Sequence, residues 1–500
     1  MRILLAASEV APLAKTGGLA DVCGALPRAL ARLGHEVAVI LPFYAAVDRR
    51  RFQPTPLLRG ITVHLPADNR DLNVWELTLP GAADAPHPVR VWLVEDDALF
   101  GRPALYAEHG RDYPDNAFRF AYFCLAALWT LKGLGWYPDV IHCNDWQTAL
   151  IPVYLRHYDA VRADADLARI RTLFTIHNIS YQGLFPPHFV HGLGLPPHLY
   201  QPEAMEFHGH LNLLKGGLLY SDALSTVSRQ YAREIQTPEF GYGLEGLLRL
   251  RAADLTGILN GIDVEEWDPA RDPALAAPYS PTRLRGKAAC KKALQQACGL
   301  PARPGTPLLG MISRLVEQKG LDLVAEVLPD LLQDDVQFVL LGSGQPEYHA
   351  LFTALARKFP RKIAVHLRFD NDLAHRIEAG ADLFLMPSRF EPCGLNQLYS
   401  LRYGTLPVVR RTGGLADSVV NATAATIKAG TATGFVFTPC EARAFAAALR
   451  RALRLYRKEP DTWTRLVRNA MVQDFSWARS ARAYEKLYRK LARSAPAPGA

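Results

Sequence analysis

The sequence has few cysteines, and none of them is placed to pair with another. There are 7 in 500 residues; their number is odd and no two of them form a Cys-x-x-Cys pair. Neither a disulfide framework nor a zinc knuckle is indicated, and a reducing cytoplasm is the expected compartment. The His-Glu-x-x-His and Gly-x-Ser-x-Gly motifs are also missing, so the sequence supports neither a metal site nor a Ser-His-Asp triad.

The sequence also lacks long apolar runs and concentrated charge. No segment stays apolar for the roughly 20 residues of a membrane helix, so none is expected. The apolar run at the N-terminus reaches Glu9 too early for a secretory signal. The formal charge of +8 comes from Lys and Arg dispersed among acidic residues. We therefore expect no nucleic acid or membrane as a partner, and a small anionic substrate fits better.

What the sequence does contain is a repeated alternation of buried strands and amphipathic helices, typical of a parallel sheet covered on both faces. Its length exceeds what one hydrophobic core usually serves. In the first half, strands are expected at 3–7, 36–41, 139–142, 172–176 and 221–227, and a helix at about 21–33. In the second half, strands are expected at 308–313, 337–341, 363–367, 383–386 and 406–409, and a helix at 321–332. The fold class is therefore α/β, with two doubly wound halves and ligand between them at the carboxyl ends of the strands.

These patterns predict four segments. Residues 1–250 and 251–473 form two Rossmann-like domains, residues 474–493 form an amphipathic helix, and residues 494–500 form a disordered tail. One internal repeat links the two halves. The six residues from Thr16 to Asp21 recur unchanged from Thr412 to Asp417, each time in a loop that leads into a helix.

The loop Lys15-Thr16-Gly17-Gly18 follows a strand and precedes a helix. Paired glycines let the backbone approach a phosphate or a sugar, the helix N-terminus adds partial positive charge, and Lys15 adds a full charge. The alternative is a tight turn with a solvated lysine. The spacing is neither the dinucleotide fingerprint nor a P-loop, which makes an NAD-dependent oxidoreductase or an NTPase less favoured.

Two further strand ends in the second half carry charge. Arg314 and Lys319 lie in one strand-to-helix loop, where two cations can neutralise a diphosphate without a metal. An exposed loop paired with Glu317 is an equal alternative. Glu391, after the strand at 383–386, can hold sugar hydroxyls and stabilise positive charge near an anomeric carbon, or it can simply favour a helix dipole.

In the first half, His177 and Asn178 end a strand, and Asp145 follows another. A histidine at a strand end is more often functional than one on a helix face, although a structural histidine fits as well.

Taken together, these segments resemble the bacterial glycogen synthase and plant starch synthase family, retaining glucosyltransferases of the GT-B fold, whose two Rossmann-like domains face each other across a cleft. The resemblance runs from Met1 to about Leu491. It rests on the segments Lys15–Val22, Thr175–Asn178, Tyr181–Gly183, Leu259–Asp263, Ser313–Leu315, Gln318–Gly320, Glu391–Leu395 and Arg411–Asp417, in this order.

The resemblance implies that glucose moves from ADP-glucose to the non-reducing 4-hydroxyl of an α-1,4-glucan primer such as glycogen, with ADP released and the α configuration retained. No cofactor and no metal are expected. The leaving phosphate would itself accept the acceptor's proton. The first domain would be the acceptor side, the second would bind the donor, and the C-terminal helix would pack back on the first domain.

The resemblance also assigns site residues. The expected catalytic residues are Lys15, His177, Arg314, Lys319 and Glu391. Of these, Lys15, Arg314 and Lys319 would hold the donor phosphates. Glu391 and the backbone of Cys393 and Gly394 would hold the glucose hydroxyls, and His177 would lie at the reacting sugar. Phe369 occupies the place of an adenine-stacking tyrosine. The other expected substrate-binding residues are Gly17, Gly18, Asp21, Asp145, Asn178, Asn260, Leu395, Asn396, Thr412 and Gly413.

Three features depart from the family pattern. Asn144 and Gln147 stand where relatives commonly have the two histidines of His-Asp-Trp-His. Asn396 replaces a frequent threonine, and Tyr399 replaces the second glutamate of a motif found in sister families. Two other functions stay open: a GT-B enzyme that uses UDP-glucose or a non-glucan acceptor, and a non-catalytic glucan-binding or regulatory protein. The sequence does not indicate an oligomeric state.

Overall fold

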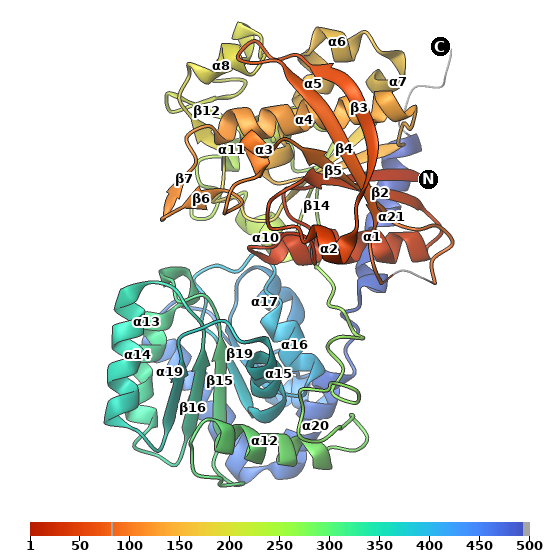
Figure 1. The fold of residues 1–500 in the computed structure, drawn as a ribbon. Helices are drawn as coiled ribbons and strands as arrows, with labels where there is room; N and C mark the ends of the chain where they lie inside the picture. Colours follow the sequence, from red (N-terminus) through yellow and green to blue (C-terminus); the bar gives the residue numbers. More distant parts are fainter. Residues whose placement is uncertain (82–83, 494–500) are drawn as a thin grey trace. The chain divides into compact units, whose positions relative to one another are not determined.

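The computed structural model describes residues 1–81 and 84–493. The chain divides into two compact units (Figure 1): unit 1 is Met1–Gly261 together with the chain from Trp477 onward, and unit 2 is Ile262–Ser476. Residues 251–261 belong to unit 1 because strand β14 (Leu255–Gly257) pairs with β13 (Ala223–Thr226) there. The expected disordered tail, residues 494–500, lies outside the described residues.

Unit 1 is built on a sheet with the strand order β14-β13-β9-β8-β1-β2-β5-β4-β3. From β14 to β5, every pair of neighbouring strands is parallel, as the sequence predicted. At the far edge β4 and β3 are antiparallel, and there the expectation of a wholly parallel sheet was wrong. The other strands are β1 (Arg2–Ala6), β2 (Glu36–Pro42), β3 (Thr55–Val63), β4 (Arg70–Thr78), β5 (Arg90–Glu95), β8 (Val140–Asn144) and β9 (Arg171–Ile176).

The helices of unit 1 cover this sheet. The main ones are α1 (Gly18–Arg32), α4 (Asn116–Leu134), α5 (Leu150–His157), α9 (Leu213–Tyr220), α10 (Arg229–Glu234), α11 (Glu245–Leu250) and α21 (Trp477–Arg493). By length and composition α4 could cross a membrane, contrary to the expectation from the sequence, but most of it is buried within unit 1.

Shorter elements complete unit 1. They are α2 (Arg49–Phe52), α3 (Asp97–Phe100), α6 (Asp159–Arg162), α7 (Ala165–Ala168), α8 (Phe189–Gly192), η1 (Trp146–Thr148), η2 (Pro197–Leu199), β6 (Ala107–Glu108), β7 (Arg111–Asp112), β10 (Leu184–Phe185), β11 (Glu206–Phe207) and β12 (His210–Asn212).

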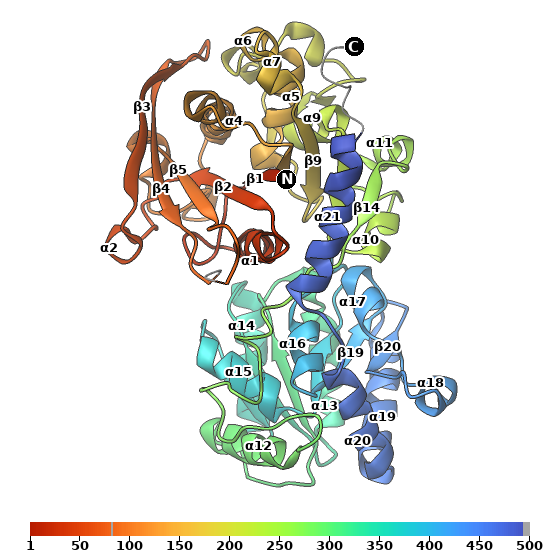
Figure 2. The ribbon, with the colours of Figure 1, turned by 90° about the vertical axis from the view of Figure 1, so that its right-hand side faces the viewer.

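The last helix, α21, packs in unit 1 against α1, β8 and β9 (Figure 2). Its apolar face carries Tyr484 and Tyr488, both fully buried. The Tyr488 hydroxyl lies 2.8 Å from Nδ1 of His142 on β8, and Nε2 of the same ring lies 2.5 Å from the Thr175 hydroxyl on β9. The end of the chain is thus hydrogen-bonded to the central strands of the first unit.

Unit 2 has a wholly parallel sheet in the order β17-β16-β15-β18-β19-β20. Its strands are β15 (Leu308–Ile312), β16 (Gln337–Leu341), β17 (Ile363–His366), β18 (Leu383–Met386), β19 (Leu406–Arg410) and β20 (Phe435–Phe437). Its helices are α12 (Arg285–Ala297), η3 (Glu317–Lys319), α13 (Leu321–Leu331), α14 (Pro346–Lys358), α15 (Asn371–Gly380), α16 (Asn396–Arg402), α17 (Gly413–Ser418), α18 (Ala424–Lys428), α19 (Ala442–Lys458) and α20 (Pro460–Met471).

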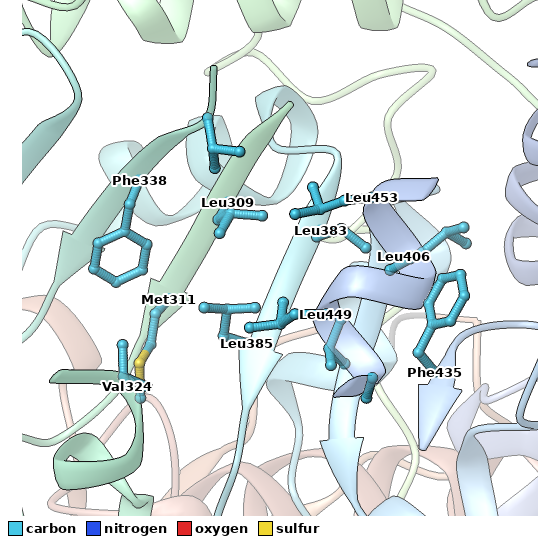
Figure 3. Packing of buried hydrophobic residues seen from close by; sticks show 14 of the residues in the cluster. Leu309, Met311, Val324, Phe338, Leu383, Leu385, Leu406, Phe435, Leu449 and Leu453 are labelled. Carbon is cyan, nitrogen blue, oxygen red and sulfur yellow. The ribbon is translucent and has the colours of Figure 1, made fainter. Parts of the chain in front are cut away.

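Both faces of the unit 2 sheet are buried. Successive residues of a strand point to opposite faces, and each face packs on a core of its own. Leu383 and Leu385 of β18 pack into a core that includes α13 and α19, part of which is drawn in Figure 3. Phe384 and Met386, between and after them, pack into a second core that includes residues of α12 and α15. This double burial explains why β18 is a continuous apolar run in the sequence.

One buried acid in unit 2 makes stability depend on pH. Glu378 on α15 is fully buried and accepts a hydrogen bond from the Ser400 hydroxyl (2.7 Å). Its other carboxyl oxygen has no hydrogen-bond partner within the described residues. Burial raises the pKa of Glu378 from 4.5 to about 8, against the opposing effects of the Ser400 hydrogen bond and the Lys287 charge.

We predict that Glu378→Gln stabilises the protein progressively as pH rises. The native state holds a proton that the unfolded carboxyl releases, so the contribution of Glu378 to stability is complete below about pH 4.5 and is lost as pH approaches about 8. The melting temperature of the variant, relative to wild type, should therefore increase from about pH 5 to about pH 8. Glu326→Gln, on the exposed side of α13, is the control and should show a constant difference. A constant difference for Glu378→Gln would contradict the prediction.

Candidate active site

In each unit the strand order reverses around one central strand. In unit 1, β1 lies between β8 and β2; in unit 2, β15 lies between β16 and β18. Where consecutive connections leave in opposite directions, a crevice forms outside the carboxyl ends of the strands, and ligands of doubly wound sheets bind there. The expected site residues follow these strands.

In unit 1 the loop after β1 is organised by a buried carboxylate, Glu9, which is only 4% exposed. Its two oxygens accept hydrogen bonds from the Thr16 amide (2.5 Å), the Thr16 hydroxyl (2.6 Å), the Gly17 amide (3.0 Å) and the Tyr106 hydroxyl (2.8 Å). The amide of Gly17 is therefore engaged by the protein itself. The sequence reasoning missed Glu9, whose only signal was an acidic residue close after a buried strand.

The exposed side of the same loop carries the charge. Lys15 forms an ion pair with Asp21 in the first turn of α1, with 2.6 Å between Nζ and Oδ1. The Lys15 side chain is 52% exposed. Water therefore screens the ion pair, and the attraction between the two side chains is weak. Burial raises the pKa of the Asp21 carboxyl, and the Lys15 charge opposes that rise. Lys15 can thus exchange Asp21 for a ligand at little cost.

The strand ends of β8 and β9 meet beside this loop. The backbone amide of His177 donates to Oδ1 of Asp145 (2.7 Å), and Nε2 of its ring lies 2.9 Å from Oδ1 of Asn144. Burial raises the pKa of Asp145 to about 7, with the backbone amides of His177 and Asn178 acting in the opposite direction. Asp145 also has a φ of 57° and a ψ of −179°, a conformation that non-glycine residues rarely adopt outside functional sites.

In unit 2, the loops after β15 and β18 bring two of the expected catalytic residues into direct contact. Nζ of Lys319 lies 2.6 Å from Oε2 of Glu391, and both side chains are largely buried. The hydroxyl of Ser388, itself buried, donates to the same carboxyl oxygen (3.0 Å). Arg314 is exposed and makes no ion pair within the described parts of the chain. Lys319 therefore pairs with Glu391 and not with Glu317, the alternative partner that the sequence left open.

The segment after Glu391 is shaped by Gln397, a fully buried residue that the sequence reasoning also missed. Its amide nitrogen donates to the carbonyls of Cys393 (3.0 Å) and Gly394 (3.1 Å). Gly394 has a φ of +68°, where a side chain is strained. The amide of Asn396 donates to the carbonyl of Ile312 at the end of β15 (2.6 Å), and so joins this segment to the loop that carries Arg314.

The two copies of the Thr-Gly-Gly sequence differ in structure. A Cβ atom added to Gly17 would meet no atom within 4 Å, and the extended backbone of Gly17 suits any residue. Gly413, the equivalent glycine, has a φ of +42°, and a Cβ there would lie 1.9 Å from the carbonyl oxygen of Glu391. The second loop therefore requires glycine for its own packing, whereas the first leaves an open surface.

The remaining expected residues are spread over both units. Phe369, after β17, is 89% exposed and does not contribute to a core. In unit 1, Asn178 accepts hydrogen bonds from the amide and hydroxyl of Ser180, while Asn260 is buried. Thr412 is buried before α17 and Leu395 directly precedes α16. Within each unit, the expected charged and polar residues thus lie in the loops or first helical turns that follow the carboxyl ends of the strands.

Known proteins resemble both units. The starch synthase catalytic domain family matches residues 2–250, and the group 1 glycosyl transferases match residues 299–470. A glycogen synthase of Anaeromyxobacter sp. (strain Fw109-5) is 54% identical over 493 residues, covering 98% of this chain and 100% of that protein. Glycogen synthase 1 of Methylococcus capsulatus is 49% identical and covers 98% of this chain and 96% of that protein. The chain belongs to the bacterial glycogen synthase family.

Solved structures agree with this assignment. The catalytic domain of starch synthase IV from Arabidopsis thaliana, bound to ADP and acarbose, has a TM-score of 0.88 at 37% identity, covering 98% of this chain and 99% of that one. Sucrose-phosphate synthase of Thermosynechococcus elongatus, at 17% identity and a TM-score of 0.58, shares the fold alone. The two-domain GT-B fold and the family expected from the sequence motifs are confirmed.

We predict that alanine has different effects at the two equivalent glycines, Gly413 and Gly17. Gly413→Ala must displace backbone against Glu391, so it should lower the free energy of unfolding by about 1 kcal/mol or more. Gly17→Ala meets no atom of the chain, so it should leave urea unfolding unchanged while it lowers enzymatic turnover. Equal loss of stability in the two variants would contradict the geometric difference between the loops.

Proposed function

We propose that this member of the family transfers glucose from ADP-glucose to the non-reducing 4-hydroxyl of an α-1,4-glucan, releases ADP and retains the α configuration. The observation that supports it best is the Lys319–Glu391 pair in unit 2, with Arg314 in the same loop after β15 as Lys319. Two cations suit a diphosphate, and a carboxylate suits sugar hydroxyls, so these residues match both parts of a nucleotide-sugar. The similarity to a starch synthase bound to ADP supports adenine over uracil in the donor.

Donor binding would rearrange one ion pair. A donor phosphate would take the place of Glu391 as the partner of Lys319, which is now 2.6 Å from that carboxylate. Glu391 would stay positioned by the Ser388 hydroxyl, 3.0 Å from Oε2, and would be free to accept hydrogen bonds from glucose. The backbone of Cys393 and Gly394 would complete the glucose contacts.

Other residues have proposed supporting roles. Lys15 would add a third positive charge to the donor phosphates, since only a screened ion pair holds it. The exposed ring of Phe369 would stack on adenine, and His177 would contact the reacting glucose. The proposed substrate-binding set is completed by Gly17, Gly18, Asp21, Asp145, Asn178, Asn260, Leu395, Asn396, Thr412 and Gly413.

We further propose that the leaving phosphate itself accepts the proton of the attacking hydroxyl. Arg314 and Lys319 would stabilise the negative charge that grows on this phosphate as the glycosidic bond breaks. In this scheme the protein supplies neither a general base nor a metal ion. The seven cysteines are all free, which is consistent with the cytoplasm as the place of action.

The donor assay tests the function directly. With glycogen as the primer, the purified protein should release ADP from ADP-glucose, and it should release almost none without a primer. UDP-glucose offered in the same assay should be used much more slowly. Failure to release ADP with any primer would overturn the proposed function, and faster use of UDP-glucose would overturn the donor assignment.

The proposed site is tested by two alanine variants. Lys15→Ala and Glu391→Ala should each lower kcat by roughly 10²–10³-fold, as for the loss of one well-placed charged contact, while circular dichroism shows an intact fold. Lys132→Ala and Glu326→Ala remove exposed charges of the same sign elsewhere in the same units and should retain wild-type turnover. Wild-type rates in both site variants would show that the site lies elsewhere.

A further inference from the structure

The amide of Asn144 has a fixed orientation at the end of β8. This residue is fully buried, and its nitrogen donates to the carbonyl of Ala6 (3.1 Å) and to the carbonyl of His142 (3.1 Å). Both hydrogens of the amide are thereby used. The opposite orientation would set an oxygen against two carbonyl oxygens and leave all three without a hydrogen. Oδ1 must therefore be the atom that faces His177.

This orientation selects one form of the His177 ring. Nε2 lies 2.9 Å from Oδ1 of Asn144, and an amide oxygen can only accept, so Nε2 must carry the hydrogen. Burial lowers the pKa of His177 to about 3, so the ring is neutral and has a single N–H. Nδ1 then holds a lone pair, and it has no hydrogen-bond partner within residues 1–81 and 84–493.

Two titratable residues, His142 and Asp145, lie close to His177. His142 is fully buried on the same strand as Asn144, and burial together with the neighbouring His177 lowers its pKa to about 3. Asp145 binds the backbone amide of His177 rather than its ring. Ring and backbone of His177 are thus held by two consecutive residues, Asn144 and Asp145.

We propose that Asn144 is a positioning residue that holds His177 as the Nε2–H tautomer, so that Nδ1 accepts a hydrogen bond from a substrate hydroxyl. The identification of that hydroxyl as one of a sugar rests on the proposed function; the tautomer does not. A histidine at position 144 can present a donor or an acceptor, whereas the anchored amide of Asn144 presents an acceptor only.

The tautomer is tested in the wild-type protein by NMR. Protein with ¹⁵N-labelled histidine gives separate ring-nitrogen patterns for the two tautomers, and comparison with His177→Gln identifies the signals of His177. We expect the Nε2–H pattern at about pH 7. The Nδ1–H pattern or an imidazolium pattern would overturn the proposal without any variant of Asn144.

The substrate contact is tested by adding ADP together with acarbose to the same sample. The Nδ1 signal of His177 should shift, because a new hydrogen bond forms at that lone pair, while the signal of His142 should stay in place. If Nδ1 does not respond although the protein releases ADP in the donor assay, the contact is wrong and the proposed function stands. If the protein lacks transferase activity, the tautomer result remains valid by itself.

The variant Asn144→Asp tests the positioning role. The aspartate cannot donate to the two carbonyls, and its charge favours a second hydrogen on the ring, which would occupy Nδ1. We expect an imidazolium signal for His177 near pH 6 and a kcat about tenfold lower there than at pH 8, as for a lost hydrogen bond. Unchanged ring signals and a wild-type pH profile in a folded variant would overturn the proposal.

Asn69→Asp is the matched control. Asn69 is exposed in the same unit, and its Oδ1 lies 3.2 Å from Nδ1 of His64, so the same charge change is made beside another histidine. The kcat of this variant should follow the wild-type pH profile. A pH-dependent loss in Asn69→Asp as large as that in Asn144→Asp would mean that charge alone causes the effect, and would also overturn the proposal.

Discussion

Parallel strands can be joined only by connections that cross the sheet, so every strand of such a sheet ends at the same edge. The candidate site in each unit depends on this constraint. Around β1 and β15 the connections leave in opposite directions, and the loops that follow are free to carry polar residues instead of packing on each other. Lys15 and His177 reach one such edge from different strands, and Lys319 and Glu391 reach the other.

Buried polar side chains then fix the conformation of these loops. Glu9 satisfies the amides around Thr16, and Gln397 satisfies the carbonyls of Cys393 and Gly394. Asn144 does the same for the ends of β1 and β8. A buried hydrogen-bonding group that loses its partner is expensive, so these loops have few alternative conformations. Most residues proposed to contact substrate lie on these fixed loops, while the side chains of Lys15 and Arg314 are exposed.

The sequence predicted the parts of the fold whose signal is local. A strand such as β18 is buried on both faces and is apolar throughout, whereas half-exposed β3 and β4 lack that signal and were missed. The site was predicted as a set of residues but not as contacts. Lys319 and Glu391 are 72 residues apart, and no local pattern shows that they form an ion pair. Identical letters around Gly17 and Gly413 also suggested similar loops, but glycine is required only at Gly413, where another loop packs against it.

The path of the chain has a consequence for its synthesis. The polypeptide enters unit 2 after Gly261 and returns after Ser476, so all of unit 2 leaves the ribosome before α21 does. Until then, the first half of the chain lacks the helix whose Tyr488 caps His142, and its central strands remain partly uncovered. The inserted unit can therefore finish folding first, and the earlier unit is closed last. A premature stop codon near the end of the gene would thus damage the part of the protein that was translated first.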